Sequence, residues 1–339
     1  MGRSDPMRCL VLFNADGNLQ TGADIDAAAV TSVRDMAVGV VSALRELGHE
    51  VTPQAIPDDL AGVVRLLRTE TPDLVFNLVE SIRGDARFEA AASWVYEWEG
   101  VLYTGSPPAA QTIGLDKPTT RAVLAGRGVP IALGATLATG DEAIPGRGPW
   151  IVKPSREDAS HGIDLGSVVI DEDAVRSRAR LIHKRFREPA LVEEFIDGRE
   201  FNVAVLGHGR TARALPLAEI DFSGFPKGAP RLITYAAKWD EASAEFRGTV
   251  PGAPKSLDPD LAAEIVRIAL AAYDAIGLRD YGRIDLRVSE RHGPVVIDVN
   301  PNPDISPDAG LAKAAARGGM SYVELIRTIV ESARARRRP

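Results

Sequence analysis

The chain has 339 residues, of which 45% are hydrophobic and 26% charged, an ordinary balance for a soluble globular protein of two or three domains. A net charge of −7 argues against a nucleic-acid-binding face, which needs a surplus of basic residues. No apolar run is long enough to cross a bilayer and no signal-peptide pattern opens the sequence. We therefore expect a cytoplasmic protein with neither a nucleic acid nor a membrane as partner.

The first third of the chain alternates between strand and helix patterns. Apolar runs predict strands over 9–14, 50–56 and 73–78. Helical periodicity is found over 33–47, 60–69 and 88–98. This alternation predicts a parallel sheet with helices on its faces, and Cys9, the sole cysteine, is expected in its core. Ligands bind at the carboxyl ends of such strands, so 14–21 and 77–85 are candidate substrate segments; ordinary loops are an equally good interpretation.

A second unit is expected to begin near Lys117. Its predicted elements are a helix over 117–125, strands over 131–138, 150–154 and 167–170, and a helix over 172–187. Further strands are predicted over 190–194, 200–206, 212–220 and 232–238, followed by a helix over 259–276. The last helix should begin after Ser321, because Glu324 three residues later completes a capping box. The basic run 334–338 is interpreted as the solvated end of that helix.

Two alternating stretches, 281–288 and 295–300, predict a β-hairpin before the last helix. Residues i and i+2 share a face of a strand, so Arg283 with Asp285, and Asp298 with Asn300, should converge on one surface. Asp and Asn are poor strand formers, which favours a functional reason for their presence. Such oxygen ligands suit Mg²⁺, which commonly carries nucleotide phosphates. The alternative is a plain solvent-facing sheet.

The sequence contains neither a GxxxxGK[ST] phosphate loop nor a GxGxxG motif after a strand. Lys153, at the end of a predicted strand, is followed by the polar loop 155–162, and this pair could hold phosphate. Glu193 and Glu200 flank a tight connection between strands and could accept hydrogen bonds from an adenine amino group or a ribose. Considered one at a time, Glu193 and Glu200 are equally well interpreted as solvated residues of a turn.

Taken in order, these motifs resemble the ATP-grasp superfamily, and most closely the D-alanine–D-alanine ligases and their relatives. The motifs are Lys117, 151–157, 192–200, 283–285 and 298–300. The resemblance implies an α/β ATP-grasp fold with an N-terminal doubly wound parallel-sheet domain, a small central lid domain and a C-terminal mixed-sheet catalytic domain. The corresponding predicted domains are 1–115, 116–192 and 193–339.

The resemblance also implies roles for single residues in binding ATP. Lys117 and Lys153 match two lysines that hold the phosphates, and Lys238 matches a third on a mobile loop. The remaining nucleotide contacts are assigned to Ser160, Glu193, Glu194, Phe195, Ile196, Glu200 and Asn300. Among these, Glu193 with the backbone of Phe195 and Ile196 matches the adenine hinge, and Glu200 matches the ribose-binding acid. The implied ligands of two Mg²⁺ ions, with Mn²⁺ as an alternative metal, are Asp285, Asp298 and Asn300.

The implied reaction is carboxylate activation, with Arg283 and Lys238 as catalytic residues. The γ-phosphoryl group moves to a substrate carboxylate, and an amine attacks the acyl phosphate to give an amide, ADP and phosphate. Arg283 matches the guanidinium that stabilises the acyl phosphate and the tetrahedral intermediate. The loops 155–162 and 222–245 are the expected lid, which excludes water. Members of the family are commonly dimers, so a homodimer is expected.

The chain departs from the ligase pattern at several positions. Asp298 stands where the family usually has Glu. At Lys153 and the loop that follows it the ligases typically carry KPSREGSS, whereas this chain has Asp158 and Ala159 in that loop. The usual tyrosine partner of the lost hydroxyl is Trp239 here. One lid hydrogen bond is therefore expected to be missing. The amino-terminal Ser-x-Glu motif is also absent, with 14–22 in its place.

The predicted substrate-site residues are Glu80, Trp239, Arg283, Asp304, Ser306 and Gly310. The serine of the family's Ser-Leu pair falls at Ala309 or Gly310, while Asp304 and Asp308 have entered the segment. These acids would disfavour a free carboxylate and favour a cation, although acids at a helix start are an equally good interpretation. His161 could contact phosphate or substrate, but an exposed loop histidine is the preferred interpretation.

The leading hypothesis is an ATP-dependent carboxylate–amine ligase acting on an amino acid or small metabolite other than two D-alanines. A true D-alanine–D-alanine ligase with a divergent pocket is the first alternative. A non-ligating ATP-binding sensor or scaffold, and phosphoryl transfer to a non-carboxylate oxygen, are the others. Neither the identity nor the chirality of the substrates follows from the sequence.

Overall fold

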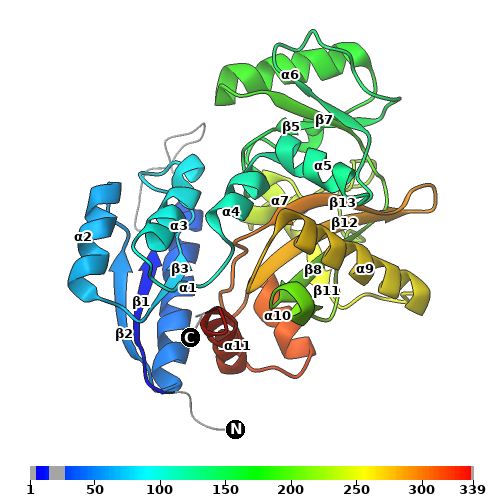
Figure 1. Cartoon of the computed structure of the whole chain (residues 1–339). Helices are drawn as coiled ribbons and strands as arrows, with labels where there is room; N and C mark the ends of the chain where they lie inside the picture. The colour runs from blue at the N-terminus through cyan, green and yellow to red at the C-terminus, as the bar shows by residue number, and fades with distance from the viewer. Residues whose placement is uncertain (1–4, 15–26, 337–339) are drawn as a thin grey trace.

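The computed structural model describes residues 5–14 and 27–336 and arranges them in three sheets with flanking helices (Figure 1). Of the candidate substrate segment 14–21, all but Asn14 lies outside the described residues, as do the last residues of the basic tail. No helix of the described part is long and apolar enough to cross a membrane.

The N-terminal sheet is parallel, as predicted, with strand order β2–β1–β3. Its elements are β1 (Arg8–Phe13), α1 (Ala27–Glu46), β2 (Glu50–Ala55), α2 (Leu60–Glu70), β3 (Leu74–Leu78) and α3 (Glu89–Trp98). In β1, Cys9 and Val11 pack with α1, while Leu10 and Leu12 pack with α2 and α3. The strand is apolar at successive positions because helices cover both of its faces.

The last two helices complete the core of this N-terminal unit. They are α10 (Gly310–Arg317) and α11 (Tyr322–Arg334), and α11 lies beside α1 (Figure 1). The predicted capping box is confirmed, since Ser321 and Glu324 exchange side-chain and backbone hydrogen bonds. Fully buried Asp280 accepts hydrogen bonds from Ser332 and Arg336 of the chain end and from the Gly105 amide.

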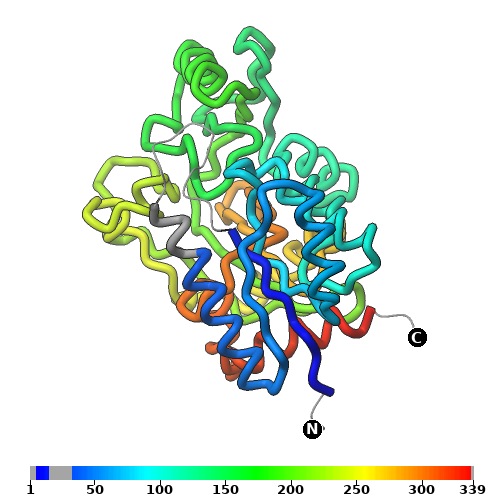
Figure 2. Tube along the Cα trace, turned by 90° about the vertical axis from the view of Figure 1, so that its left-hand side faces the viewer, coloured from blue at the N-terminus to red at the C-terminus, as the bar shows by residue number. Residues whose placement is uncertain are grey.

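The central unit is an antiparallel sheet of order β4–β7–β5–β6, with α6 packed on it. Its elements, with the helices that lead into it, are α4 (Pro108–Leu115), α5 (Lys117–Gly126), β4 (Gly134–Leu137), β5 (Trp150–Pro154), β6 (Val168–Val169), α6 (Glu172–Phe186) and β7 (Ala190–Glu194). This unit stands above the other two in both views (Figures 1 and 2). The boundary predicted after residue 192 falls inside β7.

The C-terminal sheet has the order β11–β10–β8–β12–β13, with β9 paired to β8. The elements are β8 (Arg199–Leu206), β9 (Arg213–Ala214), β10 (Ala218–Asp221), β11 (Val250–Gly252), α9 (Pro259–Ile276), β12 (Tyr281–Ser289) and β13 (Gly293–Asn300). Helix α9 packs on one face and ends at Gly277, whose positive φ of 79° suits glycine. The predicted hairpin is confirmed as the antiparallel pair β12–β13.

Two strand predictions in this region were wrong. The segment 232–238 contains the start of helix α7 (Tyr235–Trp239), which α8 (Ala244–Arg247) follows. The helix forms because the Thr234 hydroxyl caps it by accepting from the Ala237 amide at 3.0 Å. The predicted strand 212–220 is divided into β9 and β10 by Pro216, which has no amide to donate to a ladder. Short 3₁₀ turns occupy Ala86–Phe88, Leu165–Ser167 and Gly209–Thr211.

Candidate active site

Two adjoining cavities lie where the three units meet, and we call them the large chamber and the small chamber. The large chamber, of about 880 Å³, is bounded by the central and C-terminal sheets and by α7. Predicted site residues that line it are Lys117, Lys153, Ser160, Glu193, Glu194, Phe195, Ile196, Glu200, Lys238, Arg283, Asp285, Asp298, Asn300 and Gly310. The sequence motifs, scattered over nearly two hundred positions, therefore surround one space.

The small chamber, of about 350 Å³, lies between the N-terminal unit and the end of β13. Predicted substrate residues in its wall are Glu80, Trp239, Arg283, Asp304 and Gly310. Lys238, Arg283 and Asn300 line both chambers, so they stand at the junction. Ser306 lines neither chamber, which corrects its predicted position: its buried hydroxyl donates to Asp304 at 2.5 Å.

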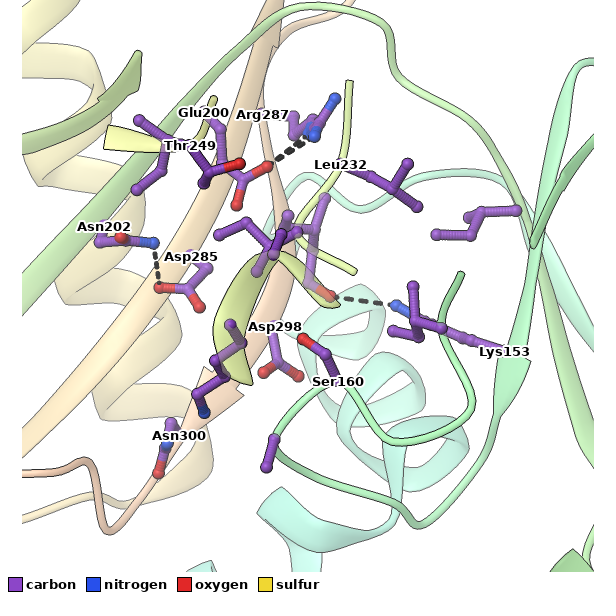
Figure 3. Close-up of a pocket in the computed structure, with 18 of the residues that line it drawn as sticks. Lys153, Ser160, Glu200, Asn202, Leu232, Thr249, Asp285, Arg287, Asp298 and Asn300 are labelled. Carbon is purple, nitrogen blue, oxygen red and sulfur yellow. Dashed lines mark hydrogen bonds and ion pairs between the residues drawn. The ribbon is translucent and has the colours of Figure 1, made fainter. Parts of the chain in front are cut away.

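The hairpin supplies the floor of the large chamber through cross-strand pairs. Asp285 of β12 lies opposite Asp298 of β13, and Arg283 lies opposite Asn300. Arg283 donates to both carboxylate oxygens of Asp285, at 2.8 and 2.9 Å. Asn202, on the neighbouring strand β8, donates to the same carboxylate at 2.8 Å (Figure 3). The convergence predicted from alternation is thus present, and it continues onto a third strand.

A β-bulge shapes this floor. The register of the hairpin shifts after Asp285, so that Leu286 lies opposite Val296 and Ile297 is the extra residue on β13. The bulge turns the Ile297 carbonyl toward Lys153, whose Nζ lies 3.5 Å away. Lys153 therefore reaches the floor from the central sheet, although it belongs to β5.

Asp285, Asp298 and Asn300 present the donor set expected for Mg²⁺. Burial alone would raise the pKa of the Asp298 carboxyl, but the charges of Lys117, Lys153 and Arg283 outweigh it and lower that pKa. Among the described residues, no cluster of three or more His, Cys, Asp or Glu could enclose a metal by itself. Two carboxylates and an amide, open to a chamber, fit an ion that also takes phosphate oxygens.

The phosphate-side lysines are held by acidic partners. Lys153 pairs with Glu193 at 2.7 Å, and Arg121 binds the same carboxylate. The Glu193 carboxylate therefore contacts these two cations while it lines the large chamber, and its implied contact with an adenine amino group stays a prediction. The pairing with Lys153 follows from the register of the central sheet, in which Glu193 of β7 lies on the strand beside Lys153 of β5.

Lys117 reaches the floor from the first turn of α5. Its Nζ donates to the Glu157 carbonyl at 2.7 Å and to Asp158 at 3.3 Å, and lies 4.0 Å from Asp298. Burial acts to lower the pKa of this ammonium, but Asp158 and Asp298 more than compensate and raise it. Lys117 thus stays charged in the position where the resemblance expects a phosphate contact.

The two lid loops are joined by a hydrogen bond other than the one expected to be missing. Ala159 and Ser160 have left-handed φ values of 54° and 63°, which turns the Ala159 carbonyl toward α7. The Trp239 indole donates to that carbonyl at 3.0 Å. A side chain-to-backbone hydrogen bond therefore replaces the missing hydroxyl–tyrosine pair.

Lys238 and His161 lie near this link. Lys238 Nζ lies 4.9 Å from the Trp239 ring centroid, and burial together with the charge of Arg283 lowers the pKa of the lysine. His161 is not an exposed loop residue, since its side chain is only 16% exposed. It stacks against Tyr235 and lies 3.3 Å from Glu157, so it helps to fix the lid.

Two asparagines, Asn14 and Asn302, hold the segment that carries Glu80 and Glu89 in place. Buried Asn14, at the end of β1, accepts from the Glu80 amide at 2.6 Å and donates to the Ser81 carbonyl at 2.5 Å. Asn302, beyond β13, donates to buried Glu89 at 3.1 Å. Burial, and then the charge of Asp304, raises the pKa of the Glu80 carboxyl to about 7. The small chamber is therefore lined by several acids, together with Lys238 and Arg283.

Four residues of the site were not among those predicted from the sequence: Arg121, Asn202, Arg287 and Asn302. Arg287 lies two residues beyond Asp285 in β12 and contacts Glu200, so the same alternation that selected Arg283 and Asp285 could have found it. Asn202 lies two residues beyond Glu200 in β8 and could have been found in the same way, whereas Arg121 depends on which helix and strand become neighbours, for which the sequence has no local signal.

Comparisons with known proteins agree with this geometry. Residues 146–331 match the family model described as "D-ala D-ala ligase C-terminus". A D-alanine–D-alanine ligase of Gluconobacter oxydans is 33% identical over 87% of this chain and 92% of its own length. The uncharacterized protein y4sG of Sinorhizobium fredii is also 33% identical, over 89% of this chain and 88% of its own.

A solved structure shares the whole fold. The D-alanine–D-alanine ligase of Bacillus anthracis, crystallised with ATP, superposes with a TM-score of 0.72 over 98% of both chains at 20% identity. This likeness supports the ATP-grasp architecture, and the sequence relatives supply the family. The chain belongs to the D-alanine–D-alanine ligase family, ATP-grasp enzymes that form carbon–nitrogen bonds and release ADP.

Proposed function

We propose that this ligase joins a carboxylate to an amine through an acyl phosphate, and that its substrates are not two D-alanines. The observation that carries the proposal is the shared wall of the two chambers. Lys238, Arg283 and Asn300 line both cavities, so a phosphate bound in one and a carboxylate bound in the other meet at these residues. Positioning of this kind is the main requirement for phosphoryl transfer.

ATP is assigned to the large chamber. Lys117 and Lys153 would bind its phosphates, and the backbone of Phe195 and Ile196 would contact the adenine. Asp285, Asp298 and Asn300 would hold two Mg²⁺ ions, whose charge offsets that of the phosphates. These residues are oriented before ATP arrives, because partner acids hold Lys153 and Lys117.

The remaining steps are assigned to groups at the junction. A carboxylate oxygen attacks the γ-phosphorus, ADP leaves, and the amine nitrogen then attacks the acyl carbon and expels phosphate. Arg283, although paired with Asp285, faces the junction and would stabilise the developing oxyanion. The Trp239–Ala159 link keeps the lid closed over the acyl phosphate, which water would otherwise hydrolyse.

The small chamber favours an amine substrate that carries an additional positive charge. Glu80, Glu89 and Asp304 line it, and burial, followed by the charge of Asp304, raises the pKa of Glu80 to about 7 although Lys238 acts to lower it. A free carboxylate, as in D-alanine, would meet like charge there. A second candidate, the true D-alanine–D-alanine ligase, is favoured by the names of several relatives, including that of Gluconobacter oxydans.

A substrate screen tests the proposal. The protein is incubated with ATP, Mg²⁺ and pairs of carboxylates and amines that include D-alanine, basic amino acids and diamines, and ADP and phosphate are measured. Hydroxylamine should intercept the acyl phosphate as a hydroxamate. AMP and pyrophosphate as products would contradict the mechanism, whereas efficient turnover with D-alanine alone would establish the second candidate.

The resemblance further supports a homodimer as the working assembly. Light scattering of the purified chain at micromolar concentration should then give twice the monomer mass of 36.2 kDa. A mass of one chain would refute this assembly.

A further inference from the structure

Arg287 is a buried cation in the wall of the large chamber. Its side chain and that of Glu200 are each about 4–5% exposed. An unpaired guanidinium at such a site would be strongly unfavourable, so its partners decide what it does. It lies on the same face of β12 as Arg283 and Asp285 but further from the junction, beside the hinge that follows β7.

The hydrogen bonds of Arg287 join three separate walls. Nε and Nη2 donate to Oε2 of Glu200 at 3.0 and 2.6 Å (Figure 3). Nη1 donates to the Ile196 carbonyl at 3.1 Å, and Nη2 donates to the Arg231 carbonyl at 2.5 Å. One guanidinium thus fixes an acid of β8, the hinge backbone and residue 231 within the second lid loop, 222–245.

Two aromatic rings keep this guanidinium in place. Its carbon lies 5.3 Å from the ring centroid of Phe195 and 5.7 Å from that of Phe222. Cation–π contacts and fixed hydrogen bonds leave Arg287 little freedom to move when a ligand enters. Arg287 is therefore suited to holding its neighbours in position and not to moving with a ligand.

The bonding pattern leaves one oxygen of Glu200 for a ligand. Both hydrogen bonds from Arg287 go to Oε2, and no partner of Oε1 is found among the described residues. Oε1 belongs to a carboxylate that lines the large chamber. A carboxylate oxygen is an acceptor for hydroxyl groups, and vicinal hydroxyls are what a ribose offers.

We propose that Arg287 is a positioning residue that holds Oε2 of Glu200, so that Oε1 meets the ribose hydroxyls and the site selects ribonucleotides. This inference rests on the proposed function, because it takes the large chamber to be the ATP site. Arg287 would then be a determinant of nucleotide selectivity. Its bond to the Arg231 carbonyl would also connect the ribose site with the lid loop 222–245.

The test compares ATP with 2′,3′-dideoxy-ATP, each with Mg²⁺, by calorimetric titration of the full chain. The wild type should bind ATP at least about tenfold more tightly, as expected for a hydrogen bond to a charged group. Arg287→Met should reduce this ratio to less than about threefold, and Arg287→Lys should restore part of it. In turnover assays, Arg287→Met should raise KM for ATP more than it lowers kcat.

A double-mutant cycle controls for the destabilisation that a single substitution causes when it leaves a buried charge unpaired. Arg287→Met alone leaves a buried carboxylate unpaired, whereas Glu200→Gln combined with Arg287→Met leaves none. Glu200→Gln should lose the same discrimination, and the double variant should lose no more. Arg199→Met is the matched control, because Arg199 pairs with Glu219 in the same sheet at 2.7 Å but does not line the large chamber.

The outcomes separate this inference from the proposed function. If the wild type prefers ATP and Arg287→Met keeps that preference within twofold, the inference is wrong while the ATP site stands. The inference is also wrong if the wild type binds both nucleotides equally. If the wild type binds neither nucleotide at millimolar concentration, the proposed function fails together with it.

Discussion

The large and small chambers share a wall but differ in how their charges are balanced. In the large chamber most charged groups have a partner of opposite sign: Lys153 with Glu193, Arg283 with Asp285, and Arg287 with Glu200. In the small chamber burial, and then the charge of Asp304, raises the pKa of the Glu80 carboxyl to about 7, and Lys238 offsets this only in part. The first arrangement suits a ligand that is the same in every turnover, whereas the acids of the second suit the cationic substrate group that we propose.

The largest effect should follow from removing a group of the large chamber. Asp298→Ala should lower turnover by at least about a thousandfold, because it removes a carboxylate assigned to both metal binding and the lysine pair. Thermal unfolding should show a folded protein. The assay is ADP release at saturating ATP and Mg²⁺.

The control for this variant is Asp221→Ala in the same sheet. Asp221 pairs with the largely exposed Lys255 outside the chamber, so activity should be kept. Turnover of Asp298→Ala within a few-fold of the wild type would remove Asp298 from the metal site and undo the assignment of the floor.

Within the large chamber, some features could be predicted from local sequence patterns and others could not. The side chains of the floor could be predicted from the alternation in 281–300. Lys117 and Lys153 could be predicted because each lies at or near the end of a helix or strand. By contrast, the partner of Glu193 depends on the pairing of β5 with β7, and the Trp239–Ala159 bond depends on how two distant loops meet. Local patterns report which face a residue occupies, but not which segment lies opposite.

Segment 232–238 illustrates the same limit for secondary structure. Its β-branched start predicts a strand, yet Thr234 caps a helix and its hydroxyl is held in turn by Glu245. A tertiary hydrogen bond to a later segment thus favours the helix. The error matters for function, because the same helix carries Lys238 and Trp239 to the junction.

The second-largest effect should appear in substrate choice. The combined change Glu80→Gln with Asp304→Asn should reduce kcat/KM for cationic amines by roughly ten- to a hundredfold, the range expected for lost charge pairs in a partly enclosed site. KM for ATP should change by less than twofold, since neither residue lines the large chamber.

Asp308→Asn is the matched control for that pair, because Asp308 lies on the same segment but is exposed and outside the chamber. If the ratio of kcat/KM for cationic amines to that for neutral amines is the same in the double variant as in the wild type, Glu80 and Asp304 do not select a cationic substrate.

A third, intermediate effect concerns pH. Burial and the charge of Asp304 place the pKa of Glu80 at about 7, so the carboxyl is neutral below that pH and charged above it. Preference for a cationic amine should therefore rise between pH 6 and 8, by up to about tenfold. The measurement is the ratio of kcat/KM for an amine bearing a quaternary ammonium to that for its uncharged isostere.

Using this ratio cancels the titration of the attacking amine itself. Glu80→Gln should make the ratio independent of pH over the same range. A wild-type ratio that stays flat would show that Glu80 does not face the bound amine.

The smallest effect should come from the lid that covers both chambers. Trp239→Phe removes the indole donor to the Ala159 carbonyl, a bond of about 1 kcal/mol, while keeping an aromatic ring beside Lys238. A looser lid admits water to the acyl phosphate. Phosphate release without amide formation should then rise about fivefold relative to ligation.

Trp98→Phe provides the matched control, since Trp98 is 84% exposed on α3 and lines neither chamber. Ligation and phosphate release are measured in the same reaction, so a general loss of activity leaves their ratio unchanged. An unchanged ratio in Trp239→Phe would show that the loop contact does not protect the intermediate, and that the two chambers are sealed by other groups.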